Sequence, residues 1–83
     1  MQNNLAPILS LADIKTGEHA VFQAFSAEKA VASRLTSLGF TPGVEIEMTQ
    51  NYGHGPLVVT LRGTRVALGR HEARQITVQK DAA

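Results

Sequence analysis

Runs of alternating apolar and polar residues predict a chain built mainly of short β-strands. In the segment 44–48, three apolar residues alternate with two glutamates, so one face of the strand is apolar and the other is charged. Four further strands are expected at 19–25, 57–61, 65–68 and 75–79. The inward-facing positions on the last three of these are Leu57, Val59, Leu61, Val66, Leu68, Ile76 and Val78.

Glycine-rich segments separate the strands and predict tight connections. Residues 51–56 read as a flexible hairpin loop. The segment 62–65, Arg-Gly-Thr-Arg, places a Gly-X pair at the centre of a tight turn, which is typical of a type II′ hairpin. Residues 69–74 leave room for one helical turn before the last strand.

One helix is expected between the first two strands. Ser26 is a good N-cap residue, and Glu28 in the first turn suits the positive end of the helix dipole. An apolar stripe follows at helical spacing and consists of Val31, Leu35 and Leu38.

The end of this helix has its own signature. Gly39 occupies the position after the C-cap, where a left-handed residue ends a helix, and Phe40 can then fold back on Leu35 in a Schellman motif. Pro42 forbids any continuation of the helix, and Gly43 follows it.

With 83 residues, the chain is long enough for one small domain. The fold class is therefore mainly β, a small barrel of about five strands with one α-helix inserted after the first strand. We expect this domain to span 8–80, with a flexible N-terminal leader at 1–7 and a tail at 81–83.

Composition narrows the function classes. The formal net charge is only +1, which argues against nucleic-acid binding driven by bulk charge. Cysteine is absent, so neither a disulfide nor a thiolate ligand is available. The longest apolar runs have three residues, whereas a membrane span needs about 20. Together these features favour a cytoplasmic protein without a secretory signal.

The reactive side chains predict neither a metal site nor catalysis. His19, His54 and His71 are far apart in the sequence, and Gln75 stands where a zinc-protease helix needs a second histidine. The chain has no phosphate-binding glycine loop and no nucleophile elbow. We therefore expect a protein that is not an enzyme and carries no cofactor, with its histidines on the surface.

The most suggestive charge pattern lies between residues 62 and 74, where four arginines stand against one glutamate. They are Arg62, Arg65, Arg70 and Arg74. Arginine is favoured at protein interfaces and at phosphate contacts. RNA binding would also require exposed aromatic residues for stacking, and the chain has few aromatics. The alternative interpretation is a solvated edge whose arginine stems lie over apolar surface.

A longer pattern is more specific. Its core is the segment 34–43, Arg-Leu-Thr-Ser-Leu-Gly-Phe-Thr-Pro-Gly, and weaker matches flank it at 11–17, 55–59, 66–68 and 72–78. In this order the segments resemble the FeoA family, small cytosolic proteins of bacterial ferrous iron uptake. The resemblance implies an SH3-like fold, which also forms the C-terminal domain of iron- and manganese-dependent transcription regulators.

Within the core segment, the expected roles are structural. Two leucines would plug the barrel, a glycine would reverse the chain, and a Pro-Gly pair would start the next strand. These residues are Leu35, Leu38, Gly39, Pro42 and Gly43.

The resemblance also implies an accessory protein that binds the cytosolic, GTP-hydrolysing part of the FeoB-type membrane transporter and meets the membrane only through it. The expected contact residues are Lys29, Arg34, Arg62, Arg65, Arg70 and Arg74. One departure affects this surface. The family often has a basic residue at the position of Gly69, and here Arg70 follows instead.

Two alternatives stay open. The chain could be a metal-regulator-type domain that binds a transcription regulator in trans, since residues 1–12 are too few for a helix-turn-helix module. It could also be a scaffold that self-associates weakly through an open strand edge.

Overall fold

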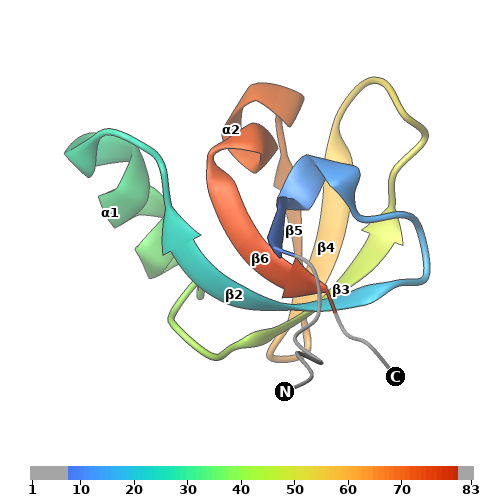
Figure 1. The fold of residues 1–83 in the computed structure, drawn as a ribbon, viewed down its shortest axis with the longest axis horizontal. Coiled ribbons are helices and arrows are strands. Elements are labelled where there is room, and N and C mark those ends of the chain that lie inside the picture. Colours follow the sequence, from blue (N-terminus) through green and yellow to red (C-terminus); the bar gives the residue numbers. More distant parts are fainter. Residues whose placement is uncertain (1–7, 81–83) are drawn as a thin grey trace, which may run out of the picture.

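The protein folds into a bent, six-stranded antiparallel sheet with two α-helices (Figure 1). The computed structural model describes residues 8–80, so the expected leader at 1–7 and tail at 81–83 lie outside the described residues. The strands are β1 (Ile8–Ser10), β2 (His19–Phe25), β3 (Glu45–Gln50), β4 (Leu57–Leu61), β5 (Thr64–Leu68) and β6 (Ile76–Lys80). The helices are the 3₁₀ turn η1 (Leu11–Asp13), α1 (Lys29–Ser37) and α2 (Arg70–Arg74).

The strand order is β1-β6-β2-β3-β4-β5, and all five predicted strands are present as β2 to β6. The prediction missed β1, which pairs with β6 and places Ile8 opposite Gln79 and Ser10 opposite Thr77. A strand of three residues is too short for alternation to be recognised in the sequence. The strand before α1 is therefore the second, β2, and not the first.

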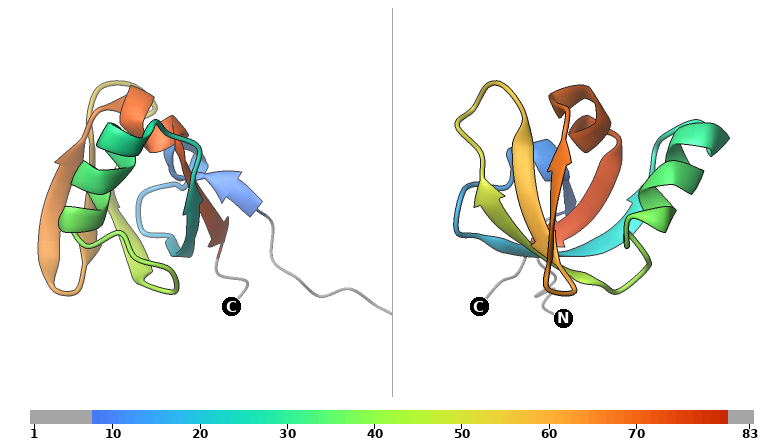
Figure 2. Two further views of the ribbon diagram at one scale, coloured as in Figure 1. Left: turned by 90° about the vertical axis from the view of Figure 1, so that its left-hand side faces the viewer. Right: turned by 180° about the vertical axis from the view of Figure 1, so that it is seen from behind.

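The predicted inward-facing positions form one hydrophobic core. Every strand position expected to face inward is buried, and so are the three apolar residues that alternate with glutamates in β3 and just before it. Figure 2 shows that the sheet is strongly curled. The register shifts between Phe22 and Ala24 and between Met48 and Gln50, and such irregularities increase local bending and twist.

Helix α1 begins later than the sequence suggests. The prediction of Ser26 as N-cap is wrong, because Glu28 precedes the first helical residue, Lys29, and no side chain caps the helix. The Ser26 N–H instead donates to the carbonyl of Gln75 at 2.7 Å, which extends the pairing of β2 with β6. Ser26 thus extends the sheet through a tertiary hydrogen bond and does not cap the helix.

The apolar stripe of α1 is confirmed in part. Leu35 is completely buried, and Val31 packs against the core from its edge. Leu38 is 39% exposed, so the expectation that it plugs the barrel is wrong. Leu38 is the C-cap residue, where the chain is already leaving the helix.

The Schellman ending of α1 is confirmed. The Gly39 N–H donates to the Thr36 carbonyl at 3.0 Å, and the Phe40 N–H donates to the Leu35 carbonyl at 3.2 Å. Gly39 has a φ of 115°, which a residue with a Cβ atom resists. This reversal brings Phe40 into the core, where its ring lies 6.2 Å from that of Phe22.

Candidate partner-binding surface

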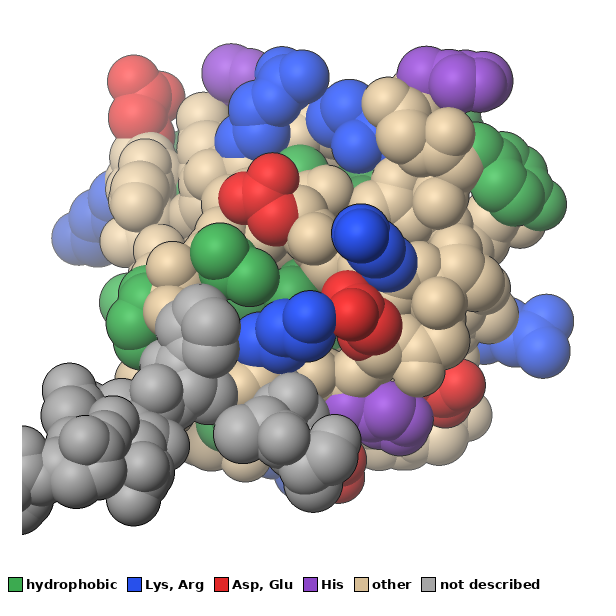
Figure 3. Space-filling model, turned by 45° about the vertical axis from the view of Figure 1, so that its right-hand side comes forward, with side chains coloured by type: hydrophobic (Ala, Val, Ile, Leu, Met, Phe, Trp, Pro, Cys, Tyr) green, Lys and Arg blue, Asp and Glu red, His purple; other side chains and the backbone are tan. Residues whose placement is uncertain are grey.

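The six basic residues expected to contact a partner are spread over three parts of the molecule. Lys29 and Arg34 lie on α1, Arg62 and Arg65 on the β4–β5 hairpin, and Arg70 and Arg74 on α2. On the face drawn in Figure 3, Lys and Arg side chains lie among acidic and uncharged ones. The arginines between 62 and 74 are close in sequence, yet an entire strand separates the first of them from the last two.

Arg70 is engaged within the molecule. Its Nη2 atom donates to Oδ1 of Asn51 at 2.9 Å, in a partly buried contact. Its Nε atom is buried and makes no hydrogen bond within residues 8–80. Arg70 therefore braces the β3–β4 loop, and a partner would meet only the rest of its guanidinium.

Asn51 joins this loop to the start of the domain. Its Nδ2 atom donates to the carbonyls of Ala12 (3.1 Å) and Ile14 (2.8 Å), and its Oδ1 atom accepts from the Gly53 N–H at 2.9 Å. Its backbone N–H donates to Oγ1 of Thr16 at 2.8 Å. Sequence reasoning did not single out Asn51, although an asparagine two residues before a glycine is a recognised turn signal.

Arg34 forms an ion pair with Glu72, which ties α1 to α2. Glu72 has a second role, because its Oε1 atom accepts a hydrogen bond from the Gly69 N–H at 3.1 Å at the start of α2. The departure from the family pattern at Gly69 therefore falls at a helix N-cap. The Arg34 side chain stays more than half exposed, so it can meet both Glu72 and a partner.

Arg62 lies in the turn between β4 and β5. Leu61 pairs with Thr64, so Arg62 and Gly63 are the two central residues, with φ angles of 52° and 78°. Positive φ at both positions defines a type I′ turn, and the prediction of type II′ is wrong. The Arg62 Nη2 atom donates to Oγ1 of Thr41 at 2.9 Å, which ties the hairpin to the segment after α1.

The other three basic side chains have no such partners. Lys29, Arg65 and Arg74 are exposed, and within residues 8–80 they make neither an ion pair nor a side-chain hydrogen bond. An unpaired cation at the surface is free to meet an acidic group on another protein, because no internal contact has to be broken. These three positions are the best contact candidates of the original six.

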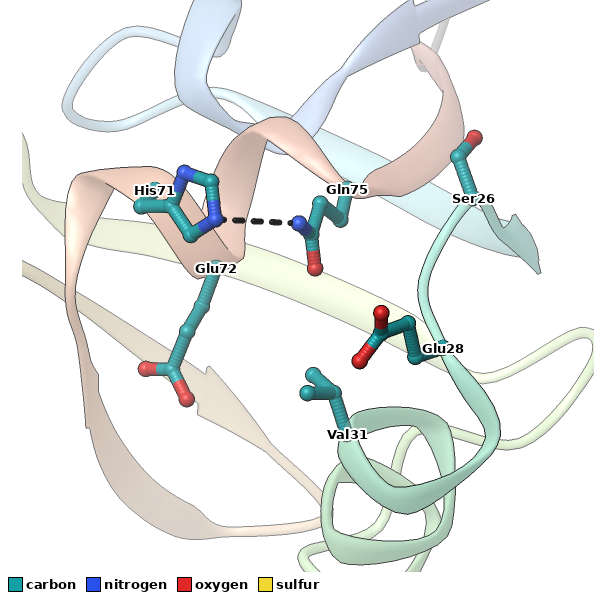
Figure 4. Close-up of a pocket in the computed structure, with 6 residues that line it drawn as sticks. All are labelled: Ser26, Glu28, Val31, His71, Glu72 and Gln75. Atoms are coloured by element: carbon teal, nitrogen blue, oxygen red, sulfur yellow. Dashed lines mark hydrogen bonds between the residues drawn. The ribbon is translucent and has the colours of Figure 1, made fainter.

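A cleft of about 280 Å³ separates the beginning of α1 from α2 (Figure 4). Its lining comes from Ser26, Glu28, Val31, His71, Glu72 and Gln75. Nε2 of His71 lies 3.1 Å from Nε2 of Gln75. The Glu72 carboxylate points away from these two side chains in Figure 4, and it is already paired with Arg34.

The three histidines lie in different parts of the fold, and all three are exposed, as expected. His19 lies 3.6 Å from Glu45 across β2 and β3, His54 is exposed in the β3–β4 loop, and His71 is exposed on α2. Within residues 8–80, no group of three histidine or carboxylate side chains is placed to hold a metal ion. Nor does that part of the chain contain a helix long and apolar enough to cross a membrane.

Comparison with known proteins identifies a matching protein family. The FeoA domain family matches residues 9–80. The chain is 30% identical over 69 residues to Fe(2+) transport protein A of Methanocaldococcus jannaschii, and the match covers 83% of each chain.

Solved structures agree with this match. A FeoA protein of Stenotrophomonas maltophilia, described as an SH3 domain protein and solved with zinc, is 33% identical with a TM-score of 0.77. The match covers 86% of this chain and 89% of that one. A manganese-dependent transcriptional repressor is 20% identical with a TM-score of 0.82, over 96% of this chain and 45% of that one, and it shares the fold. The predicted SH3-like fold is thereby confirmed.

Proposed function

This chain belongs to the FeoA family of ferrous iron transport, and from that premise we propose that it is an accessory protein that binds the cytosolic GTPase domain of a FeoB-type transporter. In this proposal it works in the cytoplasm, performs no catalysis of its own, and meets the membrane only through the transporter. It would act by protein–protein contact, through basic side chains that are exposed and unpaired within residues 8–80.

The observation that carries the proposal is that three of the six basic residues, one each on α1, β5 and α2, are exposed and unpaired within residues 8–80. Lys29, Arg65 and Arg74 have no internal partner within residues 8–80. Arg34 and Arg62 would support them from their ion pair and hydrogen bond. Arginine is enriched at protein interfaces, and rim charges raise association rates and give specificity.

The proposal is tested by titrating the isotope-labelled chain with the purified GTPase domain, with and without nucleotide, in two-dimensional amide NMR. The expected result is a set of saturable shifts confined to one face of the domain. A triple variant, Lys29→Glu, Arg65→Glu and Arg74→Glu, should keep the dispersed spectrum of a folded chain and lose most of the binding. If the wild-type chain shows no saturable shifts, the proposed function is wrong.

A second candidate follows from the likeness to the manganese-dependent repressor, in which the matching fold is part of a chain about twice as long. There the chain would bind a DNA-binding regulator in trans. Co-purification with such a regulator, without any binding to the GTPase domain, would favour this alternative.

A further inference from the structure

Among the strands of residues 8–80, β5 has a neighbour on one side only. The strand order places it at the end of the sheet, next to β4 (Figure 2, right). It runs from Thr64 to Leu68, and its pairing with β4 places Leu61 opposite Thr64, Val59 opposite Val66 and Leu57 opposite Leu68.

This register decides which backbone groups face outward. In a hairpin closed by a two-residue turn, the residues flanking the turn form a hydrogen-bonded pair, and the bonded pairs then recur at every second position. Thr64, Val66 and Leu68 are therefore bonded to β4. The N–H and C=O groups of Arg65 and Ala67 point away from β4, and within residues 8–80 they have no hydrogen-bond partner.

Helix α1 lies beside this hairpin without pairing with its edge. Its C-terminal end meets the hairpin at Leu61, against which Gly39 packs. Its middle is attached at Glu72 by the Arg34 ion pair. Both attachment points lie outside β5, one before the strand and one after it.

The side chains along this edge define the chemistry of a suitable partner. Arg65 is exposed and unpaired, Ala67 is exposed and small, and Arg62 lies in the adjoining turn. The whole hairpin, residues 57–68, contains no acidic residue. An added strand would therefore meet two positive charges and the small, exposed side chain of Ala67.

We propose that the free edge of β5 binds an extended, acidic segment of the partner as an additional antiparallel strand. The inference rests on the proposed function, in which that partner is the GTPase domain. Backbone hydrogen bonds to Arg65 and Ala67 supply the affinity, and an acidic side chain opposite Arg65 supplies the specificity. A short strand with a charge at its exposed edge is also a common safeguard against pairing with a second copy of the same chain.

The test compares two substitutions of Ala67 in the full chain. Ala67→Pro removes an N–H that β4 does not use, and Ala67→Val keeps that N–H and adds bulk. We expect Ala67→Pro to weaken binding of the GTPase domain by about tenfold or more, and Ala67→Val to bind as the wild type does. Amide spectra of both variants report whether the hairpin is still folded.

A second pair of variants tests the charge and does not depend on how the proline is tolerated. Arg65→Glu should weaken binding several-fold, and Arg65→Lys should retain it. In the wild-type chain, binding should slow the hydrogen exchange of the Arg65 and Ala67 amides. The Val66 amide, already bonded to β4, serves as the internal reference.

Three results would overturn the inference. If the wild-type chain binds while Ala67→Pro and Arg65→Glu bind equally well, the contact lies elsewhere and only the inference fails. If the wild-type chain does not bind, the proposed function and the inference fail together. If the two amides become protected with rising protein concentration in the absence of the GTPase domain, the edge pairs with a second copy instead.

Discussion

Gly39 lies against Leu61, and a Cβ atom added to Gly39 would be only 2.5 Å from Cδ1 of that leucine. The contact links the end of α1 to the β4–β5 hairpin. Leu61 belongs to the buried core, so it has little freedom to move aside. Gly39 thus combines a helix-ending conformation with a close approach, and no other residue type satisfies both.

Gly39→Ala should therefore destabilise the domain by about 2–5 kcal/mol, as the sum of a positive-φ penalty and an overpacked contact. Gly43→Ala is the matched control, since Gly43 has a φ of 86° and nothing within 4 Å of its added Cβ. The control should cost only about 1–2 kcal/mol. Urea unfolding of both variants measures the difference, and equal losses would contradict the role of Leu61.

The leucines of α1 should respond very differently to truncation. Leu35 is completely buried, so Leu35→Ala should cost about 2–5 kcal/mol and leaves a domain of this size close to unfolding. Leu38 is 39% exposed, and Leu38→Ala should cost about 1 kcal/mol or less. Chemical denaturation compares the two. Similar losses would mean that Leu38 is as deeply packed as the apolar stripe first suggested.

Asn51 is expected to hold the β3–β4 loop in place. Asn51→Ala removes two bonds donated to η1 and its following residue, one accepted from the Gly53 N–H, and one accepted from Arg70. At about 0.5–1.5 kcal/mol for each of the four bonds, the loss should total about 2–6 kcal/mol. Amide exchange at Gly53 should become much faster, whereas exchange at Val59 in β4 should change only as far as global stability falls.

A replacement that keeps half of these bonds distinguishes the contribution of the Asn51 donor atom from that of its acceptor atom. Asn51→Asp retains the acceptors for Gly53 and Arg70 and loses both donors to the carbonyls of Ala12 and Ile14. Its loss of stability should be smaller than that of Asn51→Ala. An equal or larger loss would show that repulsion between the new carboxylate oxygen and the carbonyls of Ala12 and Ile14 outweighs the two bonds that are kept.

The features that could be predicted from the sequence are those with a local cause. The strands follow from alternation, which requires only that one face be buried. The end of α1 follows from a glycine, a phenylalanine and a proline within four residues. Each of these signals lies within a few positions of the structure that it specifies.

The features that were missed depend on partners far away in the chain. Ser26 is not the cap of α1, which begins three residues later, and its N–H pairs with the carbonyl of Gln75, a residue far away in the chain. Arg70 resembled a contact residue, and its engagement by Asn51 is a contact across 19 positions that no local pattern reports. The surface was harder to predict than the core for the same reason, because a charge gives no sign of whether the fold has already paired it.

The ion pair of Glu18 and Lys80 should make the free energy of unfolding depend on pH. Lys80 Nζ lies 2.8 Å from Oε2 of Glu18, and the Lys15 N–H donates to Oε1 at 2.8 Å. The hydrogen bond from Lys80 and then that from Lys15 hold the pKa of Glu18 below its ordinary value of 4.5. In the unfolded chain the carboxyl has its ordinary pKa, so it takes up a proton at a higher pH there than in the folded chain.

The contribution of Glu18 is therefore fully present above about pH 4.5 and is lost as the pH falls through the lower, folded pKa. Glu18→Gln cannot titrate, so the wild type should be more stable than this variant at neutral pH, and the difference should shrink below pH 4.5. Lys80→Gln should remove most of the same pH dependence, because it takes away the main cause of the lowered pKa. Urea unfolding of the three proteins at pH 7 and at about pH 3 measures this. If the difference in stability between wild type and Glu18→Gln stays constant with pH, then the pKa of Glu18 is the same in the folded and the unfolded chain.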